Sequence, residues 1–156
     1  MRVVHRLCHS SYPAASGEGA KRYGGRWNPV RVPAIYAAQS RALCILERLV
    51  HLVRLPRGEV FTRILIPDVV AIHALDPAVL PDGWESSVES SAVQTLAAAA
   101  MAERDVAVLQ VPSVIVPGEF CYVLDPEHAD FAQIQFEAGM PFEYDPRLIR
   151  EGRGVS

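Results

Sequence analysis

The sequence lacks the features that would place it in a membrane or in an oxidising compartment. No apolar run approaches the roughly 20 residues of a membrane-spanning helix, and the first residues contain no apolar signal-peptide core. The three cysteines, Cys8, Cys44 and Cys121, are odd in number and have no metal-ligand spacing. We therefore expect a cytoplasmic protein without membrane association, disulfide framework or bound metal.

The two common glycine patterns for binding nucleotides are also absent. The chain contains neither a P-loop nor a Rossmann fingerprint. The five histidines show no spacing typical of a metal site. A tightly bound redox dinucleotide is therefore not expected.

The charged residues are unevenly distributed along the chain. Residues 1–63 carry a formal charge of +8, whereas residues 64–156 carry −11. A basic half in an acidic protein suits an anionic ligand or an acidic partner, although most of these arginines could simply be solvated surface. A nucleic-acid-binding module is an alternative, but only Tyr23 and Trp27 lie among the basic residues as candidate stacking rings.

Hydrophobic periodicity predicts a mixed α/β (α+β) sheet with flanking helices, in a single domain over residues 1–156. The stretches 9–25 and 67–91 have the composition of loops. Strands are expected at 3–8, 33–38, 59–66, 106–111, 120–124 and 133–137, with the fourth interrupted at Pro112 and resumed at 114–116. Helices are expected at 41–54 and 92–104.

The first predicted helix, 41–54, carries a candidate catalytic carboxylate. Ser40 is a plausible N-cap for this helix. Glu47 lies at the margin of its apolar face, which a helical wheel assigns to Ala42, Ile45, Leu46, Leu49, Val50 and Val53. A carboxylate at this margin is partly desolvated, although Glu47 could also be an ordinary boundary residue of an amphipathic helix.

A short stretch, Gly24-Gly25-Arg26-Trp27-Asn28, offers a second group of candidate site residues. A glycine pair lets the backbone approach a ligand closely, and the arginine fork suits phosphate or carboxylate. Tyr36 follows in a strand and Glu47 in a helix, so a cation, a ring and a carboxylate come in quick succession. Each has a structural explanation when taken alone, and their combination is what indicates a site.

The order of these residues resembles the RES domain, a family named for its arginine, glutamate and serine. The resemblance spans roughly Val4 to Leu148, with further matches at 37–40 and 124–128. The matching positions, in chain order, are Arg6, Gly24 to Asn28, Tyr36, Glu47 and Val111-Pro112-Ser113. The resemblance implies an ADP-ribosyltransferase-like fold, NAD as a consumed substrate rather than a cofactor, and a toxin of a bacterial type II toxin–antitoxin pair.

The resemblance also implies roles for individual residues. Glu47, Tyr36 and Arg26 would be catalytic, with Glu47 stabilising positive charge on the ribose. NAD would be bound by Arg6, Gly24, Gly25, Arg26, Trp27, Tyr36 and Ser113. The enzyme would be an NAD glycohydrolase or phosphorylase, or a mono-ADP-ribosyltransferase with a protein acceptor. A non-catalytic interaction domain is the remaining alternative.

The implied partner is an Xre-like antitoxin that covers the active site and forms a hetero-oligomer with the toxin, without direct contact to nucleic acid. Three positions depart from the family pattern. The family usually has glycine a few residues after its Trp-Asn, where this chain reads Pro29-Val30-Arg31, and it often has asparagine where Cys121 and Asp125 stand. The first departure falls in a loop that is expected to meet the ligand.

Overall fold

The computed structural model describes residues 1–86 and 88–149, and within them eight strands form one sheet. The order is β4-β5-β6-β2-β1-β3-β7, with β8 also paired to β3. Their bounds are β1 (Arg2–His9), β2 (Ile35–Ala38), β3 (Glu59–Ile66), β4 (Ile72–Ala74), β5 (Val108–Pro112), β6 (Phe120–Leu124), β7 (Gln135–Phe136) and β8 (Met140–Phe142). The predicted mixed sheet with flanking helices is confirmed.

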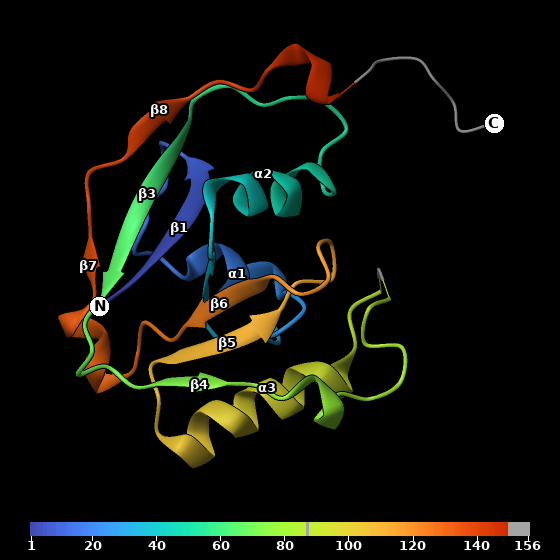
Figure 1. Ribbon diagram of the computed structural model, residues 1–156, viewed down its shortest axis with the longest axis vertical. Helices are drawn as coiled ribbons and strands as arrows, with labels where there is room; N and C mark the ends of the chain where they lie inside the picture. The colour runs from blue at the N-terminus through green and yellow to red at the C-terminus, as the bar shows by residue number, and fades with distance from the viewer. Residues whose placement is uncertain (87, 150–156) are drawn as a thin grey trace.

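The sheet is antiparallel except where β4 pairs with β5 in parallel. It curls strongly, so that β1 and β3 run steeply across the direction of β4, β5 and β6 (Figure 1). Three α-helices accompany it: α1 (Glu18–Tyr23), α2 (Arg41–Leu49) and α3 (Ser91–Arg104). Three 3₁₀ turns complete these elements: η1 (Pro77–Val79), η2 (Ala129–Gln133) and η3 (Pro146–Leu148).

Side chains alternate between the two faces of the sheet and divide the core in two. On β6, Cys121 and Val123 belong to one cluster, and Tyr122 and Leu124 to the other. The first cluster includes residues of both longer helices, namely Leu43 and Cys44 of α2 and Val93 and Ala97 of α3. Because side chains on a strand alternate, the face that carries Cys121 is the face that these helices cover.

The longer predicted strands are found, but several short elements were missed. Helix α1 lies in the stretch 9–25 that was expected to be a loop, and β4 lies in 67–91. Strand β8, which contains Pro141, was also not predicted. Residues 114–116 do not resume a strand, because β5 ends at Pro112 and the chain turns back to β6.

The prediction for helix 41–54 was wrong in its length and in its buried face. Helix α2 ends at Leu49, and its buried residues are Leu43 and Cys44. The residues of the predicted core face that are exposed instead include Leu46, Val50 and Val53, at 40%, 55% and 94%. The wheel assigned burial by hydrophobicity alone, whereas the Ser40 cap and the contact between the Cys44 thiol and the His5 carbonyl fix which side meets the sheet.

Within the described residues, no helix has both the length and the apolar character needed to cross a membrane.

Candidate active site

The Glu47 carboxylate is held by two donors that reach the same oxygen. The Ser113 hydroxyl donates to Oε1 at 2.6 Å, and the Cys121 thiol lies 3.4 Å from it as a weaker donor. Burial, followed by the nearby Glu47 charge, raises the pKa of Cys121 above its ordinary value, so its proton stays on sulfur. Among the described residues no hydrogen bond reaches Oε2, so both donors act on Oε1.

Ser113 owes its position to the end of β5. Pro112 is the last ladder residue, opposite Phe120, and Ser113 follows it with 5% of its surface exposed. The backbone N–H groups of Ile115 and Val116 donate to the serine oxygen at 3.1 and 3.0 Å. The hydroxyl oxygen accepts from this turn, and its proton is directed to Glu47.

The two glycines serve the protein's own packing. Gly24 has φ of +73°, which side-chain-bearing residues rarely adopt. A Cβ on Gly25 would lie 2.6 Å from the Tyr36 hydroxyl and 2.9 Å from Asn28 Oδ1. The interpretation that the pair clears space for a ligand thus has a competing cause, since Gly25 already leaves room for Tyr36.

Tyr36 links the glycine loop to the sheet. Its hydroxyl donates to Asn28 Oδ1 at 2.6 Å and accepts from the Trp27 backbone N–H at 3.1 Å. Burial is the largest influence on this group and raises the pKa of Tyr36, so the phenol is neutral. Asn28, itself only 3% exposed, also donates to three carbonyls of the loop, those of Ala20, Pro29 and Val32.

Arg26 and Trp27 point into a second contact region, formed by the segment before α3. Arg26 Nη1 donates to the Trp84 carbonyl at 2.5 Å. Trp27 is 6% exposed and its ring packs against Trp84, with 5.9 Å between centroids. Gln94 of α3 donates to the Gly25 carbonyl at 2.8 Å. The predicted stacking ring is therefore part of the core, and Arg26 is partly exposed with one nitrogen already bonded.

Arg6 contacts the backbone of Tyr36 rather than its ring. It donates to the Tyr36 carbonyl at 3.2 Å and more weakly to the Ser16 carbonyl at 3.5 Å, and its buried Nε has no partner among residues 1–86 and 88–149. Burial raises the pKa of Cys44 to about 12, and both Glu47 and Arg6 act on this thiol. Cys44 therefore lies within electrostatic reach of the arginine and the candidate catalytic carboxylate.

The predicted site residues thus form two adjoining clusters, one around Tyr36 and one around Glu47. Strand β2 joins them, since it carries Tyr36 and its Ala38 pairs with Cys121 on β6. Two hollows of about 550 and 450 Å³ lie elsewhere, along 51–57 and beside the N-terminus. The site is therefore assigned from its chemistry rather than from a deep cavity.

Sequence reasoning named the residues of both clusters but missed several supporting groups. The Cys121 contact to Glu47 and the Gln94 contact to Gly25 carried no sequence signal, because they join residues 74 and 69 positions apart. The role of Asn28 had a signal, since it ends the glycine motif. No three His, Cys, Asp or Glu side chains within 1–86 and 88–149 gather as metal ligands would.

A curled mixed sheet in which an arginine bonds the backbone of Tyr36, and a serine bonds a glutamate in the adjoining cluster, defines a recognisable class of domain. The RES domain family model matches residues 2–145. The chain belongs to the RES domain family, as its motif order predicted.

Two curated relatives and one solved structure are similar to this chain. It is 40% identical over 140 residues to the Prs ADP-ribosylating toxin of Sphingobium sp. (strain YBL2), covering 87% of each chain. It is 60% identical over 46 residues to the NAD(+) phosphorylase MbcT of Mycobacterium tuberculosis (strain ATCC 25618 / H37Rv), covering 29% of this chain and 25% of that one. The crystal structure of the M. tuberculosis MbcT–MbcA toxin–antitoxin complex matches with a TM-score of 0.72 at 24% identity, covering 94% of this chain and 86% of the other, which shows a shared fold.

Proposed function

We propose that this protein is an NAD-consuming toxin that cleaves the bond between nicotinamide and ribose. The observation that carries the proposal is the Glu47 carboxylate, whose Oε1 is held by Ser113 and Cys121. The activities named for the two relatives agree with it, because ADP-ribosylation and NAD phosphorolysis both begin by breaking this bond.

The chemistry requires a negative charge next to the sugar. As nicotinamide departs, the ribose acquires positive, oxocarbenium-like character. A carboxylate fixed by two donors keeps its position while that charge develops, which is the property that makes electrostatic stabilisation effective. Oε2 of Glu47 is the atom proposed to face the ribose.

The remaining site residues are proposed to hold the dinucleotide. Arg6 bonds the Tyr36 carbonyl, the charge of Arg26 acts on the Tyr36 hydroxyl, and both guanidinium groups suit the two phosphates. The neutral Tyr36 ring is proposed to lie against the nicotinamide end, with Gly24, Gly25 and Trp27 shaping the loop and Ser113 close to the ribose. Arg26 would keep further N–H groups for a phosphate, since its bond to the Trp84 carbonyl uses one nitrogen.

The test is release of nicotinamide from NAD by the purified protein. Glu47→Gln preserves side-chain size but removes the charge, and should lower the rate by about 100-fold or more. Arg26→Lys keeps the charge but loses the guanidinium fork, and should weaken NAD binding measured by calorimetry. Nicotinamide release by Glu47→Gln at the unmodified rate would disprove the catalytic role.

The acceptor of the ADP-ribosyl group is decided by the same reaction run under three conditions. Turnover in buffer alone indicates water as acceptor, dependence on inorganic phosphate indicates phosphorolysis, and mass gain on lysate proteins indicates protein ADP-ribosylation.

We further propose a protein antitoxin as partner, since the structural neighbour is a toxin–antitoxin complex. An Xre-like identity for it follows from the family resemblance.

A further inference from the structure

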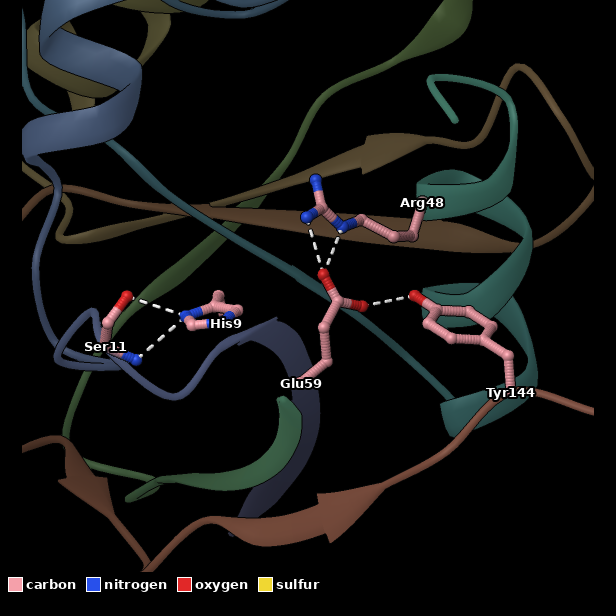
Figure 2. A network of polar contacts seen from close by, with 5 residues as sticks. All are labelled: His9, Ser11, Arg48, Glu59 and Tyr144. Carbon is pink, nitrogen blue, oxygen red and sulfur yellow. Dashed lines mark hydrogen bonds and ion pairs between the residues drawn. The ribbon is translucent and has the colours of Figure 1, made fainter. Parts of the chain in front are cut away.

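A second polar network lies outside the candidate site and centres on Glu59, the first residue of β3. The Glu59 side chain is 0% exposed, and its Oε1 accepts from Arg48 Nε and Nη2 at 2.8 and 2.5 Å. Its Oε2 accepts from the Tyr144 hydroxyl (Figure 2). A buried carboxylate persists in a fold only when it is paired and hydrogen-bonded, so these three side chains depend on one another.

The three residues come from three separate segments of the chain. Arg48 belongs to the last turn of α2, Glu59 begins β3, and Tyr144 follows β8. Figure 2 shows the arginine and the tyrosine meeting the carboxylate from different sides. The network therefore fastens the end of α2 both to the sheet and to the segment that follows β8.

Helix α2 needs this attachment because its apolar packing lies near its start. Ser40 caps the helix, and Leu43 and Cys44 are its buried residues. Further along, Leu46 and Val50 are 40% and 55% exposed. The last turn, which carries Glu47, therefore has no fully buried apolar residue to hold it.

Glu47 and Arg48 are adjacent on α2, and their side chains leave the helix about 100° apart. Glu47 reaches Ser113 after β5, whereas Arg48 reaches Glu59 on β3. The Ser40 cap and the Cys44 contact fix which side of the helix meets the sheet, and these two further contacts, in different directions, hold its last turn.

We propose that Arg48, Glu59 and Tyr144 are positioning residues that hold Glu47 in place for the reaction. The network fixes the last turn of α2, and the turn places Glu47 Oε1 at the Ser113 hydroxyl. The kinetic consequence rests on the proposed function, whereas the consequence for the position of Glu47 does not.

Tyr144→Phe tests the proposal with little disturbance. The variant loses the hydroxyl but keeps the ring that packs on Phe142, with 4.8 Å between centroids. We expect kcat for nicotinamide release to fall about tenfold, while KM for NAD changes less than about twofold, because the reacting carboxylate is displaced but the binding groups are not.

Tyr122→Phe is the matched control. Tyr122 is 1% exposed, lies in the other core cluster, and donates to Gln110 Oε1 at 3.0 Å. The Tyr122→Phe variant should lose about as much thermal stability as Tyr144→Phe, and its kcat should be unchanged. If the network has a purely structural role, both variants should show a lower melting temperature, and the kcat of Tyr144→Phe should equal that of Tyr122→Phe. That result would overturn the proposal.

A crystal structure of Tyr144→Phe separates this inference from the proposed function. If the unmodified protein releases no nicotinamide, the proposed function fails, and the distance from Ser113 Oγ to Glu47 Oε1 decides the inference alone. Lengthening from 2.6 Å supports the positioning role. An unchanged distance overturns it.

Discussion

Gly25 lies so close to the Tyr36 hydroxyl that no other residue fits without movement. In Gly25→Ala the new methyl group would lie 2.6 Å from that hydroxyl and 2.9 Å from Asn28 Oδ1. Both atoms are fixed by their mutual hydrogen bond, so the loop must shift, at a cost of about 1–3 kcal/mol. Nicotinamide release should fall at least about tenfold, because Arg26 follows directly.

Gly19→Ala provides the control for this substitution. Gly19 lies in α1, and a Cβ there meets nothing within 4 Å. Its activity should equal that of the unmodified protein, and chemical denaturation should show equal or higher stability. Full activity in Gly25→Ala would show that the contact between the loop and Tyr36 is dispensable.

Arg31 stands in the stretch where the family usually has glycine, and this departure affects the backbone conformation. Its φ of 77° lies in the left-handed region, which costs a side-chain-bearing residue about 1–2 kcal/mol. The family's usual glycine in this stretch would avoid that cost. Arg31→Gly should therefore raise the free energy of unfolding by up to about 1 kcal/mol, after allowing for the greater freedom of glycine in the unfolded chain.

Urea unfolding at neutral pH measures this difference. Arg57→Gly is the matched control, because Arg57 is also exposed but is not among the described residues with positive φ. That control should be neutral or destabilising. A loss of stability in Arg31→Gly equal to that in Arg57→Gly would mean that the backbone at Arg31 is not strained.

At the scale of helices and strands, the sequence predicted correctly those features that are determined by residues close together along the chain. Strand β3 was predicted with its correct bounds because its residues alternate over a long run. Strands β4 and β8 have three residues each, too few for a period to show. The orientation of α2 depended on the sheet, which is why its apolar stripe was wrongly placed in the core.

The candidate site shows the same contrast between features set by the local sequence and features set by the fold. The order of Arg26, Tyr36, Glu47 and Ser113 along the chain named its members. Sequence did not reveal that Gly25 accommodates Tyr36 or that Arg26 contacts Trp84, because both facts arise between segments that only the fold brings together. The roles of these residues toward NAD stay predictions, as does a single domain over 1–156.

At the scale of the whole molecule, the charge asymmetry bears on how a partner would bind. The proposed mouth of the site is basic and is made up of Arg6, Lys21, Arg22, Arg26 and Arg31. An antitoxin segment that covers the site should carry carboxylates that replace the NAD phosphates, so NAD and the antitoxin should compete. Raising the salt concentration should slow association more than it speeds dissociation, because screening weakens long-range steering.

Surface plasmon resonance at several NAD and salt concentrations measures both effects. Arg147→Gln is a suitable control, since this exposed arginine already pairs with Asp145 and lies outside the proposed contact. Its association rate should match that of the unmodified protein. Unchanged antitoxin affinity in saturating NAD would mean that the partner acts from another surface.

The packing of Trp27 on Trp84 has a practical consequence for all of these experiments. The chain has two tryptophans, and these are the two. Its tryptophan fluorescence therefore originates entirely where the loop that carries Arg26 meets the segment before α3, with no label attached. A ligand, an antitoxin or a substitution that moves this loop should change the emission, and an event elsewhere in the protein should leave the emission unaltered.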